Sequence, residues 1–84
     1  MDIQNLLTMA NQVGSFHRSF PDHAEAVKGT AMHLRRSWDP RMRRALLAHV
    51  DATQGEGLDP IVMEAITGYR KELTPPPVST PASA

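Results

Sequence analysis

The sequence predicts a small all-α domain of four short helices followed by a disordered, Pro-rich C-terminal tail. Apolar residues recur at the period of a helix, and no run alternates β-branched or aromatic residues as a strand would. An Asp-Pro pair, which suits the start of a helix, occurs twice. We expect helices over about 2–20, 22–38, 40–53 and 60–73, a domain over 1–73 and a tail over 74–84.

The first expected helix carries an apolar arc of roughly 180°, wider than the roughly 100° stripe that a surface helix needs to cover one core. The residues on this arc are Ile3, Leu6, Leu7, Met9, Ala10, Val13, Gly14, Phe16 and Phe20. Part of this face is therefore expected to meet another chain. His17 lies near the centre of the arc, where we expect a core histidine with one hydrogen-bond partner.

Capping residues separate the first three helices. Pro21 ends the first, and Asp22 with Glu25 three residues later forms a capping box that begins the second. Asp39 supplies the N-cap of the third helix, and Pro40 takes its first position, where a missing N–H is harmless. A single short Trp-Asp-Pro joint therefore connects the second and third helices.

The third helix ends, and the fourth begins, at residues with clear local preferences. The glycines of the QGEG stretch, residues 54–57, suit a left-handed cap. Asp59 and Pro60 repeat the helix start found earlier. His49 falls within the apolar stripe of the third helix and is also expected in the core. From Thr74 onward, prolines and small side chains support neither a helix nor a core.

Composition excludes several classes of chemistry. The chain has 84 residues, no Cys and a formal net charge of zero. Without Cys it has no disulfide, thiolate zinc site, cysteine-ligated iron–sulfur cluster or cysteine nucleophile. The four histidines lack metal-ligand spacing, and most acids are helix caps or surface groups. We therefore expect this chain to supply no catalytic residue and to bind no cofactor and no metal.

Hydropathy and the N-terminal residues predict where in the cell the protein is found. No apolar run approaches the roughly 20 residues that span a bilayer. The N-terminal stretch MDIQNLLTMANQ has an acid and no basic segment of the kind that begins a secretory signal. We expect a cytoplasmic protein without membrane contact.

Five of the seven arginines lie in the stretch RRSWDPRMRR. Arg35 and Arg36 fall in the last turn of the second helix, where the helix dipole favours a cation. Arg41, Arg43 and Arg44 fall in the first turn of the third helix, where each is unfavourable by roughly 0.3–1 kcal/mol if exposed. We expect intrachain acids, or the carboxylates, phosphates or carbonyls of a partner, to compensate these three.

Two apolar residues share the outer faces that carry these arginines. On a helical wheel Leu47 lies one turn after Arg43 and Arg44, and Met32 lies on the outer side of the second helix. Arginine together with Met and Leu is typical of a protein interface. We therefore predict a partner interface at Arg41, Arg43, Arg44, Leu47 and Met32, with Trp38 setting the angle between the second and third helices.

Three stretches resemble a known family. They are LLTMANQVGSF at 6–16, HLRRSWDPRMR at 33–43 and GLDPIVMEA at 57–65. In this order they resemble the delta subunit family of the NAD-dependent, molybdenum-containing formate dehydrogenase, over roughly residues 1–72. Ser37 takes a place where the family often has an aromatic residue.

The resemblance implies a non-catalytic accessory subunit that supports assembly, stability or cofactor retention. In such an enzyme the alpha subunit carries a molybdopterin cofactor and iron–sulfur clusters, and the beta and gamma subunits carry FMN and further clusters. The implied partners are these larger subunits, above all the catalytic alpha subunit. Asn11 and Gln12 are interface candidates on the resemblance alone.

Three alternatives remain open at the level of sequence. A small helical nucleic-acid-binding module would also place arginines at a helix N-terminus, but the zero net charge, the short joint and the lack of a basic arm oppose it, so we expect no nucleic acid partner. The second alternative is a general protein-interaction module. In the third alternative, the arginines pair with Asp39, Asp51 and Glu56 at a surface that binds no partner.

Overall fold

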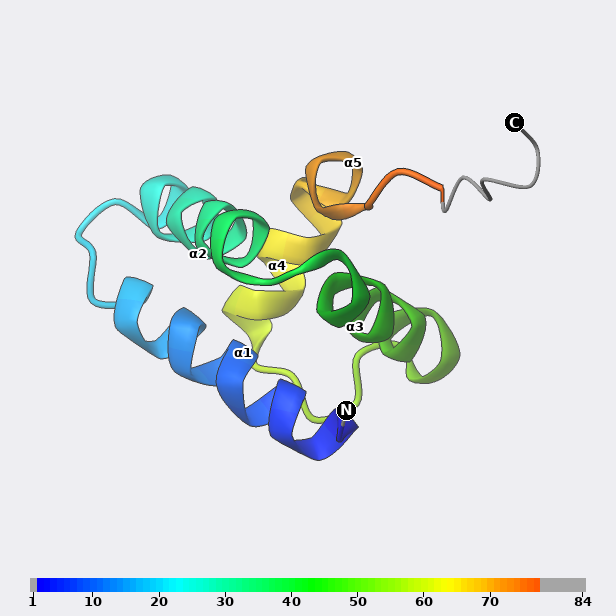
Figure 1. Ribbon diagram of the computed structural model, residues 1–84. Helices are drawn as coiled ribbons and strands as arrows, with labels where there is room; N and C mark the ends of the chain where they lie inside the picture. Colours follow the sequence, from blue (N-terminus) through cyan, green and yellow to red (C-terminus); the bar gives the residue numbers. More distant parts are fainter. Residues whose placement is uncertain (1, 78–84) are drawn as a thin grey trace.

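The computed structural model describes residues 2–77, and within them the chain forms five helices and no strand (Figure 1). The helices are α1 (Ile3–His17), α2 (His23–Ser37), α3 (Pro40–Thr53), α4 (Pro60–Gly68) and α5 (Arg70–Leu73). The predicted all-α fold class is confirmed. From residue 78 onward the predicted tail lies outside the described residues.

Two helix boundaries differ from the prediction. α1 ends at His17 rather than near Phe20, because the proline at position 21 disfavours a helical conformation at the residue before it. The N–H of Phe20 instead bonds the carbonyl oxygen of His17 at 3.0 Å in a turn. The predicted fourth helix is two helices, since Tyr69 between α4 and α5 has φ −121° and ψ 28°, outside the α-helical region.

Aspartate side chains begin three of the helices. Asp2, Asp22 and Asp39 accept hydrogen bonds of 3.1, 3.1 and 3.0 Å from backbone N–H groups in the first turns of α1, α2 and α3. The side chain of Asp59 makes no such bond. Its backbone N–H donates to the side-chain oxygen of Asn11 at 2.9 Å, so a contact from α1 locates the start of α4.

The end of α3 is closed by a left-handed turn and a histidine. Gln54 has φ 60°, and Gly55 and Gly57 follow with φ 80° and 89°. Nε2 of His49 donates to the carbonyl oxygen of Glu56 at 2.6 Å, which ties the helix to the residues after it. His49 is only half-buried. Its ring therefore closes this turn. The apolar stripe of the third helix had predicted that His49 lies in the core, and that prediction is wrong.

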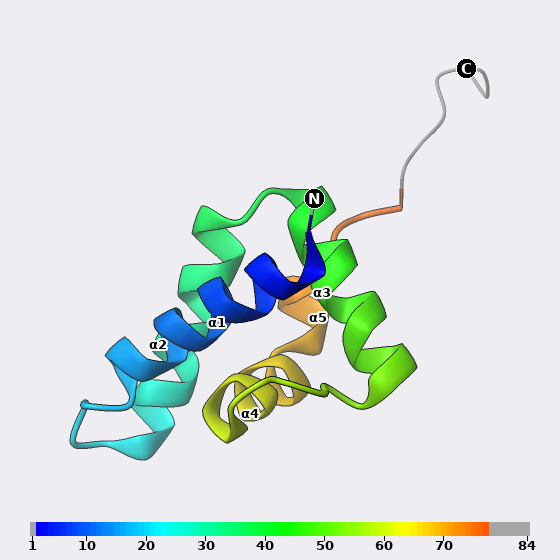
Figure 2. The ribbon, with the colours of Figure 1, turned by 90° about the horizontal axis from the view of Figure 1, so that it is seen from below.

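The core lies where α1, α2 and α4 meet. α1 and α2 run antiparallel beside each other, and α4 packs against both (Figures 1 and 2). A Cβ at position 14 would lie 2.8 Å from Cγ2 of both Ile61 and Val62, so the glycine found there lets α1 approach α4 closely. Among the most deeply buried side chains are Leu34, Leu46, Val62, Ile66 and Leu73.

Candidate protein-interaction site

An apolar groove of about 480 Å³ lies on the surface of α1 and α2. α1 lines it with Met9, Gln12, Val13, Phe16 and His17. α2 adds His33 and Ser37, and Trp38 and Met42 line the groove where α2 joins α3. Apart from one amide, one hydroxyl and two imidazoles, every lining side chain is apolar or aromatic, which is the composition of a binding surface.

Four aromatic rings are grouped at one end of this groove. The ring of His17 lies 5.0 Å from that of Phe16, 5.2 Å from that of Phe20 and 6.0 Å from that of His33, all between ring centroids. Nδ1 of His17 donates to the carbonyl oxygen of Val13 at 2.9 Å. His17 is 8% exposed, which confirms the prediction of a buried histidine with one hydrogen-bond partner.

The two phenylalanines of this group are exposed to solvent. Phe16 is 66% exposed and Phe20 is 39% exposed. Among the described residues, these two are the large apolar side chains that face solvent most openly. Their rings meet edge to face at 5.9 Å. Adjoining exposed aromatic rings beside an apolar groove are typical of a surface that another molecule covers. The wide apolar arc of α1 had indicated such a surface.

Two arginines of the predicted interface are engaged within the chain. Nη1 of Arg43 donates to the carbonyl oxygen of Leu73 at 3.3 Å, and Nη2 of Arg44 donates to that of Pro76 at 3.2 Å. Nε of Arg35 donates similarly to the carbonyl oxygen of Glu72 at 3.1 Å. Backbone carbonyls at and after the end of α5 therefore compensate Arg43 and Arg44, although we had expected acids or a partner to do so. Their contact with a partner stays a prediction.

Leu47 contradicts the expectation that it is an exposed contact, because it is 6% exposed and belongs to the core. Arg43 lies one turn before it on the same face of α3. The bond from Arg43 to the carbonyl of Leu73 places the end of α5 on this face, and Pro75 after it is buried. Residues expected at the start of a loose tail thus cover the side of α3 that the helical wheel assigned to solvent.

The other candidates from the sequence are found in different surroundings. Trp38 is buried in the core and also lines the groove. Gln12 is exposed and lines the groove, and Met32 is half-buried on α2. Asn11 donates to the carbonyl oxygen of Gly57 at 2.9 Å and accepts from Asp59, so its amide holds the loop before α4. Only Trp38 and Gln12 among the predicted residues line the groove.

Seven further groove residues were not predicted as site residues, and one of them, His17, was expected only as a core histidine. Met9, Val13 and Phe16 lay within the wide arc of α1, which was the one sequence signal for them. Nothing in the local pattern of α2 or α3 indicated the others, because they come together only when the helices pack. These others are His33, Ser37 and Met42.

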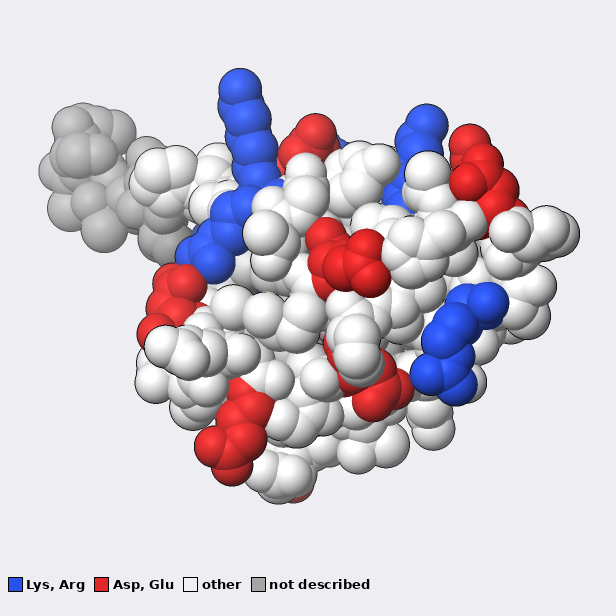
Figure 3. Space-filling model, turned by 180° about the vertical axis from the view of Figure 1, so that it is seen from behind, with Lys and Arg blue, Asp and Glu red and all other residues white. Residues whose placement is uncertain are grey.

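Two arginines that directly adjoin lining residues in sequence remain exposed. The side chains of Arg36 and Arg41, next to Ser37 and Met42, make no hydrogen bond or ion pair with other parts of residues 2–77. Elsewhere the charges are mixed: Figure 3 shows positive and negative residues interspersed over the face opposite to that of Figure 1. Of the interface arginines predicted from the sequence, Arg41 alone has its guanidinium free within the described part of the chain.

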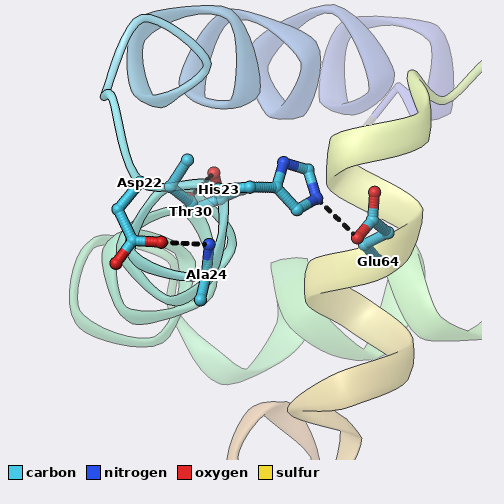
Figure 4. Close-up of polar contacts among 6 residues, drawn as sticks. Asp22, His23, Ala24, Thr30 and Glu64 are labelled. Atoms are coloured by element: carbon cyan, nitrogen blue, oxygen red, sulfur yellow. Dashed lines mark hydrogen bonds and ion pairs between the residues drawn. The ribbon is translucent and has the colours of Figure 1, made fainter.

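Within residues 2–77, the ion pairs between helices do not involve the arginines of the RRSWDPRMRR stretch. Nη1 and Nη2 of Arg70 donate to the two carboxylate oxygens of Asp51, each at 2.8 Å. Nε2 of His23, at the start of α2, lies 2.8 Å from Oε2 of Glu64 on α4 (Figure 4). Asp51 thus pairs with an arginine of α5, whereas the alternative of a surface that binds no partner paired it with that stretch.

Neither a metal site nor a membrane span is formed by the described residues. Between residues 2 and 77, no three His, Asp or Glu side chains gather in a way that could hold a metal ion. In the same part of the chain, no helix has both the length and the apolar character needed to cross a bilayer.

Comparison with known families identifies the chain. A family model described as the NADH-dependent formate dehydrogenase delta subunit FdsD matches residues 5–66. The chain belongs to this family. No curated protein and no solved structure gives a match. The resemblance to the formate dehydrogenase delta subunit family seen in the three sequence stretches is confirmed.

The delta subunit match covers the groove completely. Its span, residues 5–66, contains α2 and α3 and most of α1 and α4. All residues that line the groove lie between Met9 and Met42, inside the match. The carbonyls of Leu73 and Pro76 that hold two of the arginines lie outside it. The groove therefore belongs to the part of the chain that this delta subunit shares with its family.

Proposed function

We propose that this chain is a non-catalytic accessory subunit of a NADH-dependent formate dehydrogenase, and that it binds a larger subunit through the groove on α1 and α2. The catalytic alpha subunit is the partner we propose. The observation that carries the proposal is the apolar groove with exposed Phe16 at its edge, inside the region matched by the family model. Binding there supports the assembly, the stability or the cofactor retention of the larger subunit.

The energetics of the groove favour a protein partner. Apolar surface contributes roughly 25 cal/mol for each Å² removed from water, and aromatic side chains provide much of the binding energy of protein interfaces. Phe16 and Phe20 expose such surface beside the partly buried Met9 and Val13. A domain this small also buries only a modest share of its own surface, so a partner that covers the groove adds to its stability.

The cofactors of the complex are proposed to belong to the larger subunits. These cofactors are a molybdopterin, iron–sulfur clusters and FMN. The side-chain chemistry of this chain supports that division, because it has no Cys to ligate a cluster or a molybdenum centre. The buried His17 ring donates to a backbone carbonyl and is packed against other rings, so its role is structural. We further propose a cytoplasmic location, since the enzyme uses the NADH pool of that compartment.

Purification from cells that express all formate dehydrogenase subunits tests the proposal. An affinity-tagged copy of this chain is expected to recover the alpha subunit in a stoichiometric complex. Deletion of the chain is expected to lower the yield or the molybdenum content of the complex, whereas added purified chain neither oxidises formate nor reduces NAD by itself. Recovery of the chain alone, from cells that contain the assembled enzyme, would contradict the proposed function.

A further inference from the structure

We infer that the groove binds an amphipathic helix of the larger subunit, and that this helix carries carboxylates which meet Arg36 and Arg41. This inference rests on the proposed function and specifies the chemistry of the partner. Three observations lead to it: the shape and lining of the groove, the nature of the surrounding secondary structure and the sign of the charges along its edges.

The length of the groove suits a short stretch of helix. Along α1 the lining runs from Met9 to His17, which corresponds to about 12 Å at 1.5 Å per residue. A helix laid in a groove of that length presents two or three apolar residues spaced three or four positions apart. The rings of Phe16 and Trp38, which both line the groove, are aromatic surfaces against which those residues would pack.

A helix also satisfies its own backbone groups in this environment. The described residues contain no strand, so an extended segment would find no sheet edge to pair with. Its N–H and C=O groups would then face apolar side chains without partners, which is costly. The groove offers few polar atoms to replace them, mainly those of Gln12, Ser37 and the imidazole of His33. A helical partner needs none of them.

The charged residues next to the lining in sequence are arginines, apart from Asp39. α1 has no Asp or Glu within Ile3–His17. On the other side, exposed Arg36 precedes Ser37 and exposed Arg41 precedes Met42. The carboxylate next to the lining in sequence is Asp39, whose Oδ1 already accepts from the N–H of Met42. An apolar groove edged by free guanidinium groups fits a partner helix with Asp or Glu beside its apolar stripe.

Arg41 allows binding to be separated from folding. In the first turn of α3 its charge opposes the helix dipole, so Arg41→Glu should leave the thermal stability of the free chain unchanged or raised. The same change reverses the charge offered to an acidic partner. Lys71→Glu on α5 is a matched control, since it makes the same change of charge at an exposed site that is not part of the groove.

The experiment is a competition for incorporation into the complex. Cells that express all formate dehydrogenase subunits produce the untagged wild-type chain and a tagged variant at equal levels, and mass spectrometry of the purified complex gives their ratio. We expect Arg41→Glu and Phe16→Ala each to be incorporated about tenfold less than wild type. Lys71→Glu is expected to match wild type. Thermal unfolding of each free chain confirms that the variants are folded.

Photo-crosslinking identifies the occupant of the groove. With p-benzoylphenylalanine in place of Phe16, the crosslinked peptide is expected to come from a helix of a larger subunit that contains Asp or Glu. A crosslink to a second copy of this chain, or to a segment without carboxylates, would overturn the inference. Equal incorporation of Arg41→Glu, Phe16→Ala and wild type would also overturn it, while leaving the proposed function intact. If the wild-type chain is not incorporated at all, both this inference and the proposed function fail.

Discussion

Gly29 on α2 lies so close to His17 on α1 that a Cβ at position 29 would overlap Cδ2 of the imidazole. The ring has little freedom to move away, because it donates to the carbonyl of Val13 and packs against the rings of Phe16 and His33. The absent side chain on α2 therefore makes room for the histidine that lines the groove. Fold and proposed binding surface depend on the same close contact.

Gly29→Ala is expected to destabilise the chain. Alanine is favoured over glycine inside a helix by about 1 kcal/mol, but the overlap with His17 costs about 1–3 kcal/mol and should prevail. Urea denaturation measures the difference. Gly68→Ala is the matched control, because nothing lies within 4 Å of the added Cβ, and this variant should be stabilised by about 0.5–1 kcal/mol. Equal effects of the two substitutions would show that His17 does not constrain position 29.

Arg43 and Arg41 are expected to respond differently to alanine substitution. Arg43→Ala removes a charged hydrogen bond to the carbonyl of Leu73 and should lower the free energy of unfolding by about 1–3 kcal/mol. Hydrogen exchange of the Thr74 amide, which bonds the carbonyl of Arg70, should become faster. Arg41→Ala should be neutral or stabilising by about 0.3–1 kcal/mol, since it removes a cation from a helix start. If both variants lose the same stability, the intrachain contact of Arg43 is not significant.

Asn11 is expected to be a structural residue. Its amide makes two bonds of 2.9 Å to the backbone of Gly57 and Asp59, so Asn11→Ala leaves two backbone groups without partners. We expect a loss of about 1–3 kcal/mol in the free energy of unfolding, together with faster hydrogen exchange of the Asp59 amide. Gln12→Ala, next to it but exposed, should change stability by less than about 0.5 kcal/mol. A stable Asn11→Ala chain that fails to join the complex would instead assign Asn11 to the interface.

The contact between Asp51 and Arg70 predicts a dependence of stability on pH. The hydrogen bonds from Arg70, and secondarily its charge, hold the pKa of Asp51 below its ordinary value of 3.8. A lowered pKa means that the stabilisation is complete above this value and is lost as the pH falls through the pKa of the folded state. Asp51→Asn should therefore be less stable than wild type at neutral pH.

The difference between Asp51→Asn and wild type should shrink as the pH falls through the lowered pKa of Asp51, because the wild-type carboxylate then becomes protonated. Urea denaturation at several pH values measures the effect. Glu56→Gln is the control, since the side chain of Glu56 is exposed and forms no ion pair within the described residues. A gap between Asp51→Asn and wild type that persists unchanged at low pH would show that ionisation of Asp51 is not its cause.

The sequence by itself determined the helices and the family. Asp22, Asp39 and Pro60 begin helices for local reasons, since a cap or a preset φ depends on only a few neighbouring residues. The apolar period of each segment predicted the all-α class, and the wide arc of α1 indicated a surface for another chain. Family membership was recognised from three stretches, one of which contains the Trp-Asp-Pro joint, and was confirmed by the match over residues 5–66.

Tertiary structure alone decided which of those residues form the candidate site. A helical wheel assigned Leu47 and Arg43 to the outside of α3, but α5 and the residues after it cover that face. The groove is lined by both Phe16 on α1 and Trp38 at the end of α2, and no local pattern predicts which residues of two helices line the same groove. Local preferences act over a few residues, whereas burial depends on which elements pack together, so exposure could be read only from the folded chain.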